Sequence, residues 1–326
     1  MSDEIGFNIG VYAATDVGLI RSGNEDNFLV LNLSTADTWT PLTVEGSPPE
    51  SLVSFKQGHY GTVLAVTDGM GGALAGEVAS RLAVESVRDR MLELQASPSY
   101  SRYPFPERLR LAIELANTHI HYESLTHEDY AGMGATFTAA GLYGETAYFA
   151  QVGDSRAYVI RNGTVRQITR DQSLVGQLVE SGHLTEQEAE QHTYKNVILQ
   201  ALGASSYINV AVNKMSLCNK DILVLCSDGL SNKVRGEEMM EVIGKSATVT
   251  EACHSLIELA NERGGEDNIT VMVARVAEGA LDKACPGASD SGEAAWNIET
   301  IPRDPDLPKE VDPEMIGSED DTLPPP

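Results

Sequence analysis

Two apolar segments far apart in this sequence end in the same acidic turn. Residues 63–66 lead into Asp68-Gly69, and residues 223–225 lead into Asp228-Gly229. Continuous apolar runs of this kind are typical of strands that are buried on both faces. A buried strand holds its last residue in place, and the glycine lets the backbone turn sharply after it. The chain is therefore expected to fold around two buried strands that each present an aspartate at a fixed point.

A second pair of acidic motifs lies near the two ends of the same region. Glu25-Asp26-Asn27 follows Ser22-Gly23-Asn24, and Glu266-Asp267-Asn268 follows Gly264-Gly265, each beside a β-like run. Several carboxylates gathered at strand ends repel one another unless cations neutralise them. Mg²⁺ and Mn²⁺ prefer such oxygen ligands in octahedral geometry. However, a single Asp-Gly after a strand is usually a simple turn, so the pattern alone supports a metal site and a set of solvated turns about equally.

The overall composition excludes several classes of protein. The formal net charge is −25, and 42% of the 326 residues are hydrophobic. Nucleic-acid binding needs clustered Lys and Arg, which so acidic a chain lacks, whereas its hydrophobic fraction supports a sizeable core. No apolar run approaches the roughly 20 residues that cross a bilayer, and the start has no signal-peptide pattern. We expect a soluble, cytoplasmic protein with neither nucleic-acid nor membrane partners, whose four cysteines are reduced thiols.

Other common functional motifs are absent from the sequence. It contains no glycine-rich nucleotide-binding loop, no EF-hand loop and no histidine pair of the zinc-protease type. Residues 153–156 lack the form of a serine hydrolase elbow. The acidic motifs are therefore the main candidates for chemistry.

The rest of the sequence alternates strand-like and helix-like segments. Residues 76–95 and 106–125 carry apolar side chains at helical spacing. Short strands separated by hairpin turns are expected over residues 136–142, 147–152, 157–161 and 165–168. Because the hairpin strands and the helices occur in separate groups, the expected class is α+β rather than parallel α/β.

Two segments do not follow this pattern. Residues 33–60 show little periodicity and are expected to form a long surface loop inserted between strands. Residues 280–326 contain 12 acidic and 3 basic residues and 8 of the 14 prolines. Such a segment has too little apolar surface to offset its ordering entropy. The sequence therefore predicts one folded domain over residues 1–278 and a disordered acidic, proline-rich tail over residues 279–326.

Six ordered motifs connect the chain to a known family. They are Arg21-Ser22-Gly23-Asn24-Glu25-Asp26, Val66-Thr67-Asp68-Gly69-Met70-Gly71-Gly72, Gly132-Met133-Gly134-Ala135-Thr136, Val152-Gly153-Asp154-Ser155-Arg156, Cys226-Ser227-Asp228-Gly229-Leu230 and Gly265-Glu266-Asp267-Asn268-Ile269-Thr270. From about Gly6 to Val276 the chain resembles the metal-dependent PP2C-type (PPM) serine/threonine phosphatases, most closely their bacterial branch. The resemblance implies a β-sandwich of two antiparallel sheets flanked by pairs of α-helices, in four αββα layers.

The resemblance also implies a ligand set for two divalent cations. Asp68 matches the carboxylate that bridges both metals, and the carbonyl of Gly69 matches a further ligand. Asp228 and Asp267 match ligands of the first metal.

The other ligands belong to the second metal and to a third one. Glu25 matches the ligand of the second metal, and Asp26 matches the adjacent acid that holds it directly or through water. Asp129, three residues before Gly132, lies where bacterial members supply a ligand to a third metal. The implied cofactors are therefore two or three Mn²⁺ or Mg²⁺ ions.

The implied reaction is hydrolysis of phosphoserine and phosphothreonine in proteins by a metal-bridged water. Arg21 matches the arginine that binds the substrate phosphate, a role suited to a bidentate guanidinium. Arg21 and Asp68 are the two catalytic residues that the resemblance implies. Residues 171–193 match a flap beside the active site. Met70 stands where many eukaryotic members carry a histidine that protonates the leaving oxygen, so a metal-bound water is the implied proton donor.

The implied partners are phosphorylated proteins, above all a bacterial Ser/Thr kinase and its targets. The enzyme itself is expected to be a monomer. One alternative is a catalytically inactive relative that binds phosphoproteins or scaffolds a pathway. Inactive relatives usually lack one or more of the metal carboxylates. In this sequence the carboxylates for the two catalytic metals are all present: Glu25, Asp26, Asp68, Asp228 and Asp267. A narrower alternative is a phosphatase dedicated to a single partner, such as an anti-anti-sigma factor.

Overall fold

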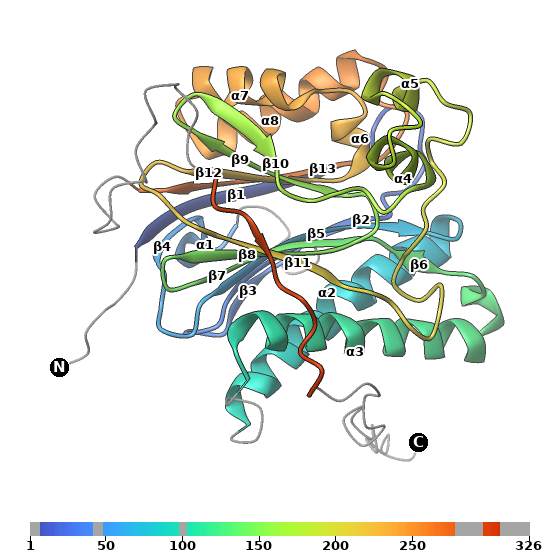
Figure 1. The fold of residues 1–326 in the computed structure, drawn as a ribbon, viewed down its shortest axis with the longest axis horizontal. Coiled ribbons are helices and arrows are strands. Elements are labelled where there is room, and N and C mark those ends of the chain that lie inside the picture. The colour runs from blue at the N-terminus through green and yellow to red at the C-terminus, as the bar shows by residue number, and fades with distance from the viewer. Residues whose placement is uncertain (1–6, 42–47, 98–102, 278–295, 307–326) are drawn as a thin grey trace, which may run out of the picture.

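The computed structural model describes residues 7–41, 48–97, 103–277 and 296–306, and their strands form two antiparallel sheets (Figure 1). The first sheet has the order β10 (Thr164–Gln167), β9 (Arg156–Arg161), β12 (Ile222–Cys226), β13 (Ile269–Val276), β1 (Asn8–Asp16) and β4 (Ser54–Lys56). The second has the order β14 (Glu299–Thr300), β11 (Ala211–Ser216), β8 (Thr146–Val152), β7 (Phe137–Tyr143), β5 (Thr62–Met70), β2 (Asp26–Asn32) and β3 (Asp37–Trp39). The short strand β6 (Gly134–Ala135) pairs with the end of β5.

Helices cover the outer face of each sheet. The long pair α2 (Ala73–Ala96) and α3 (Phe105–Thr126) lies against the second sheet, and α7 (Gly236–Lys245) and α8 (Val249–Glu262) lie against the first (Figure 1). A third hydrophobic cluster fills the space between the sheets. The short helices are α1 (Glu50–Val53), α4 (Leu174–Glu180), α5 (Glu186–Glu190), α6 (Asp228–Ser231) and the 3-10 turn η1 (Glu128–Tyr130). These four layers confirm the expected α+β sandwich.

The apolar run in β5 explains why this strand is buried on both faces. Successive side chains of a strand point to opposite faces. Val63 and Ala65 accordingly pack in the cluster beneath α2 and α3, whereas Leu64 and Val66 pack between the two sheets. The strand is therefore fixed from both sides, and with it the residues that follow.

The structure corrects the expectation for residues 33–60. They contain the edge strands β3 and β4 and the short helix α1, with residues 42–47 outside the described part. β3 extends the second sheet beside β2, and β4 extends the first beside β1. Trp39 and Leu52 are buried, so much of the segment packs on the sandwich instead of forming a surface loop.

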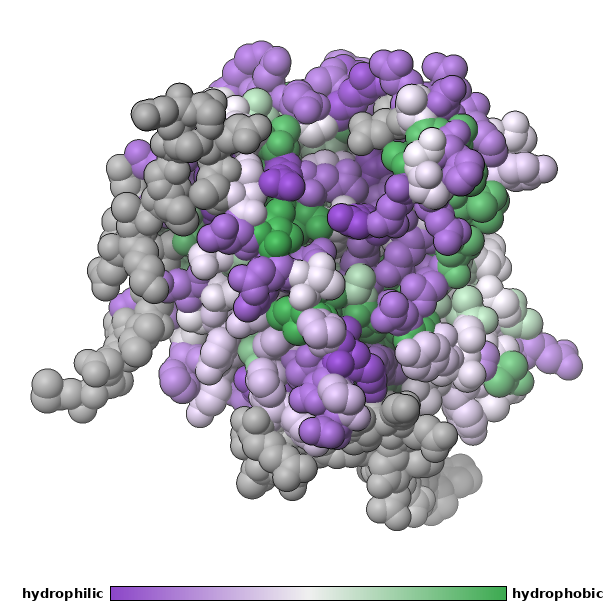
Figure 2. Space-filling view, viewed as in Figure 1, coloured by the Kyte–Doolittle hydropathy of each residue, from purple (hydrophilic) through white to green (hydrophobic). Residues whose placement is uncertain are grey.

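The structure describes residues 296–306 of the expected disordered tail, and these residues do not form a disordered segment. Residues 296–306 run across the sandwich, and β14 pairs with β11 (Figure 1). Figure 2 shows that this face of the molecule is mostly hydrophilic, with small hydrophobic patches near its middle. Ile298 and Ile301 pack against the apolar clusters. Residues 278–295 and 307–326 of the expected tail lie outside the described residues.

Two further expectations concern the cysteines and the membrane. Cys226 and Cys253 are free and buried, as expected, but Cys218 is disulfide-bonded, which corrects the expectation of four reduced thiols. None of the described helices is long and apolar enough to cross a bilayer.

Candidate metal centre

The pairing of β2 with β5 brings the first two acidic motifs together. Asp26 lies directly opposite Asp68 in the antiparallel register, so both carboxylates stand at the same end of the second sheet. Beyond this pair, the backbone N–H of Gly69 donates to the carbonyl of Glu25 at 3.1 Å. Glu25, Asp26 and Asp68, together with Gly69 and its predicted ligand carbonyl, therefore lie at the same end of the second sheet.

The first sheet brings the other two motifs to the same place. Asp228 begins α6 two residues after β12, and Asp267 lies two residues before β13, the neighbour of β12. Across the sandwich, the hydroxyl of Ser227 donates to Asp26 at 2.7 Å. The cluster is therefore formed where the ends of both sheets meet.

Asn268 joins the N-terminal and C-terminal acidic loops. Its side-chain amide donates to the carbonyls of Val17 and Gly23, both at 2.9 Å, and its carbonyl oxygen accepts from the N–H of Glu25 at 2.8 Å. These bonds link residues that are 243 to 251 positions apart in sequence. The asparagine that ends the second acidic motif thus positions the first one.

Thr136 supports the bridging candidate Asp68. Its hydroxyl accepts from the N–H of Asp68 at 3.0 Å, and its own N–H donates to the carbonyl of Asp68 at 2.8 Å. The hydroxyl of Ser155 lies 2.7 Å from that of Thr136. The two remaining motifs of the family pattern are therefore packed beneath Asp68.

The carboxylates of the cluster are in surroundings that disfavour charge. Burial raises the pKa of Asp26 to about 7 despite the hydrogen bond from Ser227. Burial, followed by the charges of Asp26 and Asp228, raises the pKa of Asp68 well above its usual range. Burial and then Asp267 raise the pKa of Asp228. A positive charge placed among these groups would favour the ionised carboxylates and so oppose each shift.

Unpaired oxygens give an independent test of whether cations fit here. Among the described residues, one carboxylate oxygen of Asp26 and one of Asp228 are buried without a hydrogen-bond donor. Buried acceptors without a partner are costly, and hard cations bind such oxygens. Within the same residues, no three acidic, thiol or imidazole groups lie close enough together to hold a metal ion as they stand. The residue types and their placement fit divalent cations.

Arg21 and Glu25 lie at the open side of the cluster. The guanidinium of Arg21 is exposed and donates to Asp267 at 2.9 Å. The carboxylate of Glu25 lies so close to Gly76 in α2 that a β-carbon at that glycine would collide with it. The first turns of α2 thus limit where Glu25 can point.

Asp129 makes no contact with the other predicted ligands among the described interactions. It lies on η1 and is exposed. The predicted flap, residues 171–193, contains the short helices α4 and α5.

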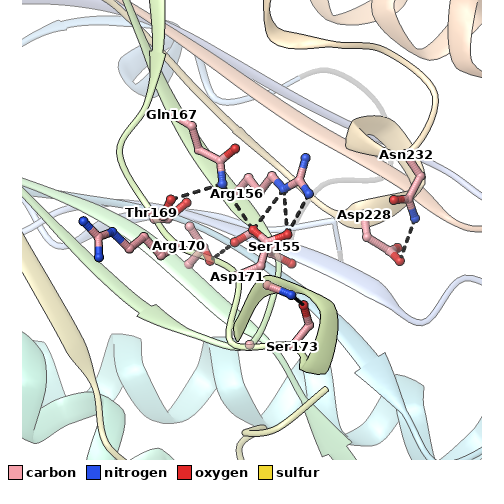
Figure 3. Close-up of polar contacts among 12 residues, drawn as sticks. Ser155, Arg156, Gln167, Thr169, Arg170, Asp171, Ser173, Asp228 and Asn232 are labelled. Atoms are coloured by element: carbon pink, nitrogen blue, oxygen red, sulfur yellow. Dashed lines mark hydrogen bonds and ion pairs between the residues drawn. The ribbon is translucent and has the colours of Figure 1, made fainter. Parts of the chain in front are cut away.

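Two polar groups of the motif Val152-Gly153-Asp154-Ser155-Arg156 lie beside the cluster, although the sequence alone indicated no catalytic or metal-binding role for them. Asp154 follows β8 and is buried, and burial followed by the charge of Asp228 raises its pKa to about 7. Arg156 on β9 holds Asp171 at the base of the flap through contacts of 2.6 and 3.0 Å (Figure 3). The signal for Asp154 was the same strand-then-aspartate pattern seen at Asp68, whereas only the fold brings Arg156 and Asp171 together.

Comparison with known proteins agrees with this geometry. A family model described as protein phosphatase 2C matches residues 44–262. The serine/threonine phosphatase stp of Listeria monocytogenes is 35% identical, with 79% of this chain and 92% of that protein covered.

Solved structures show the same fold. The crystal structure of the serine/threonine phosphatase Stp1 from Staphylococcus aureus is 29% identical with a TM-score of 0.71, covering 85% of this chain and 98% of that one. The catalytic domain of the serine/threonine protein phosphatase PstP in complex with two manganese ions is 31% identical with a TM-score of 0.64, covering 83% and 100%.

The two-sheet sandwich, the carboxylates at its shared end and these matches define one class of protein. The chain belongs to the protein phosphatase 2C family. Like the bacterial phosphatases that it resembles, it is an enzyme of the protein serine/threonine phosphatase type.

Proposed function

We propose that this chain hydrolyses phosphoserine and phosphothreonine side chains of proteins at the carboxylate cluster between its two sheets. The observation that supports this most is the meeting of the buried Asp26 with the half-buried Asp68 and Asp228, where two acceptor oxygens have no hydrogen-bond donor among the described residues. The names of the relatives support the same reaction, and the two manganese ions of one structural neighbour support the same kind of cofactor.

In this proposal the cations are held from both sheets. Asp68 would hold both cations, the carbonyl of Gly69 would supply a further oxygen ligand, and Asp228 and Asp267 would complete the first position. Glu25 would hold the second position, together with Asp26 directly or through water. When bound, the two cations would neutralise charge on the phosphoryl oxygens and lower the pKa of the attacking water.

Arg21 is the candidate for binding the substrate phosphate. Its guanidinium is exposed at the rim, and its described carboxylate partner is Asp267 at 2.9 Å. A phosphoryl group would offer the same guanidinium two oxygens in bidentate geometry. Met70 follows Gly69 on β5 and cannot donate a proton, so the leaving oxygen would take its proton from water.

Several finer properties belong to the same proposal. The native ions are Mn²⁺ or Mg²⁺, and Asp129 contributes to a third one. Residues 171–193 act as a flap over the bound substrate. The protein works as a cytoplasmic monomer on substrates of a serine/threonine kinase.

A direct test is hydrolysis of phosphopeptides by the purified protein. Phosphothreonine and phosphoserine peptides are expected to be hydrolysed with Mn²⁺ or Mg²⁺ and not with EDTA, and a phosphotyrosine peptide serves as the comparison. Absence of turnover with either metal, in protein shown to be folded by circular dichroism, would instead favour an inactive phosphoprotein-binding relative.

A further inference from the structure

A buried arginine at the start of α3 has no anionic partner among the described residues. Arg108 is only 7% exposed, and its Nε makes no hydrogen bond within this part of the chain. The neighbouring acid, Glu107, is paired with Arg110 at 3.3 Å. Arg108 itself lies over the face of the Phe105 ring, with 5.7 Å between the ring centroid and the guanidinium carbon, and Tyr143 is nearby. Burial of a charge without a counterion is costly, so the structure leaves a place for an anion.

Arg108 lines a pocket of about 470 Å³. Its walls are formed by the first turn of α3, by the β7–β8 hairpin and by β11 with the segment at β14. The side chains that matter here are Phe105, Arg108, Tyr143, Tyr148, Lys214 and Ile301. Two cationic groups and two phenol hydroxyls thus border a space with aromatic walls.

This pocket lies far from the metal centre. Arg108 is in the first turn of α3, whereas the C-terminal end of that helix leads to β6, which pairs with Met70 and Gly69. A helix of 22 residues is about 33 Å long. An anion bound at Arg108 would therefore not contact the carboxylate cluster.

The C-terminal segment completes the pocket. Ile301 contributes to its wall and donates its N–H to the carbonyl of Val212 at 2.8 Å. Glu299 holds Lys214 at 2.9 Å, which keeps the ammonium group beside the opening. Without residues 296–306, both the wall and the position of this lysine would be lost.

We propose that this pocket binds a small oxyanion, meaning a sulfate, phosphate or carboxylate group, through Arg108, and that docking of β14 completes the site. A guanidinium presents donors that match two oxygens of such a group. The hydroxyls of Tyr143 and Tyr148 can supply further donors. Burial also lowers the pKa of Arg108, which is the direction expected of a cation without a bound counterion.

The test uses sulfate, which a phosphatase does not hydrolyse, and the full-length protein in EDTA. Calorimetric titration is expected to show saturable binding that chloride at equal ionic strength does not reproduce. Arg108→Gln should weaken this binding by at least about tenfold, and Arg108→Lys should weaken it less. Ile301→Pro, which removes the N–H that bonds to Val212, should weaken it as well. Arg170→Gln is the matched control, because Arg170 is exposed and pairs with Glu180 outside the pocket and away from residues 296–306.

A crystal soaked in selenate locates the anion independently of stability or activity. The proposal predicts an anomalous peak within hydrogen-bond distance of the Arg108 guanidinium. Sulfate binding that Arg108→Gln leaves unchanged, or a selenate peak at Arg21 with none at Arg108, would overturn it.

Discussion

Asp26 and Asp154 are buried acids whose pKa values burial raises from 3.8 to about 7. Between about pH 3.8 and pH 7, these two carboxyl groups keep their protons in the folded protein and release them in the unfolded chain. The free energy of unfolding therefore falls as pH rises through this window. Glu238 opposes this trend only below about pH 4.5, because Arg263 lowers its pKa to about 2 from 4.5, so it does not change the slope between pH 5 and pH 7.

The metal-free protein is accordingly expected to melt at a lower temperature at about pH 7.5 than at about pH 5, by on the order of 5 °C. Mn²⁺ should stabilise it more at the higher pH, because cations replace the bound protons. Differential scanning calorimetry in EDTA and in Mn²⁺ measures both effects. Asp154→Asn should flatten the slope without metal, and a melting temperature that rises across this range would contradict the assignment.

Gly76 tests the position of Glu25. A β-carbon at Gly76 would collide with the Glu25 carboxylate, so Gly76→Ala is expected to weaken Mn²⁺ binding by about tenfold. Gly244→Ala is the matched control, because Gly244 is also helical and has open space around it. Isothermal titration of both variants measures the difference. Equal Mn²⁺ affinity in the two variants would show that Glu25 does not hold a cation in this position.

At the scale of secondary-structure elements, the start of the flap is tied to the sandwich near the cluster, by Arg156 and by hydrogen bonds between Gln172 and Gly153. Arg156 on β9 binds Asp171 in bidentate fashion, and the N–H of Leu174 donates to Val197 where the flap returns. Farther along, Arg170 pairs with Glu180 on the surface, where both side chains are mostly exposed. The first pair is thus placed to orient the flap, and the second is not.

Arg156→Lys should therefore reduce kcat/KM for a phosphopeptide by about tenfold, because a lysine cannot reproduce the bidentate contact. Arg170→Lys makes the same chemical change in an exposed pair and should have little effect. Steady-state kinetics of the two variants, with melting temperatures to confirm folding, compare them. A similar loss in both variants would exclude a specific role for the Arg156–Asp171 pair.

Strong periodicity made most elements predictable. The patterns over residues 76–95 and 106–125 lie within α2 and α3, and the expected strands over 147–152 and 157–161 lie within β8 and β9. β11 was not predicted, because its sequence mixes Asn213 and Lys214 with apolar residues and its pairing with β8 is set by the fold. The same holds for β14, which is two residues long and acquires its conformation only at the edge of β11.

The candidate site was predictable to a similar degree. Strand-then-aspartate patterns and the family motifs located Asp68 and Asp228, which the structure brings to one place. The contacts of Asn268 and Arg156 depend on segments that only the tertiary structure joins. No local sequence pattern could have indicated them.

At the scale of the whole molecule, residues 296–306 connect the outer edge of the second sheet to α3. Arg110 donates to the carbonyls of Val210 and Ile301, and Arg303 pairs with Glu114. Trp296 lies over the guanidinium of Arg161 with 5.3 Å between the ring centroid and the guanidinium carbon. This segment therefore contributes to the stability of the domain.

A chain ending at residue 295 is expected to be less stable than one ending at residue 306 by about 3 kcal/mol, because it loses apolar burial and leaves the buried Arg110 short of an acceptor. The chain ending at 306 should match the full-length protein. Urea unfolding followed by fluorescence gives the free energies. Equal stability of the two truncated chains would show that the segment is only loosely associated.

The most direct test of the central claim measures Mn²⁺ binding and phosphothreonine-peptide hydrolysis in the wild type and in Asp68→Asn. Asp89→Asn, an exposed aspartate on α2, is the control. We expect the wild-type chain to bind two Mn²⁺ ions. Asp68→Asn should bind Mn²⁺ more weakly and lose turnover by about a thousandfold, whereas Asp89→Asn should match the wild type. Wild-type turnover in Asp68→Asn would contradict a metal centre built around this residue.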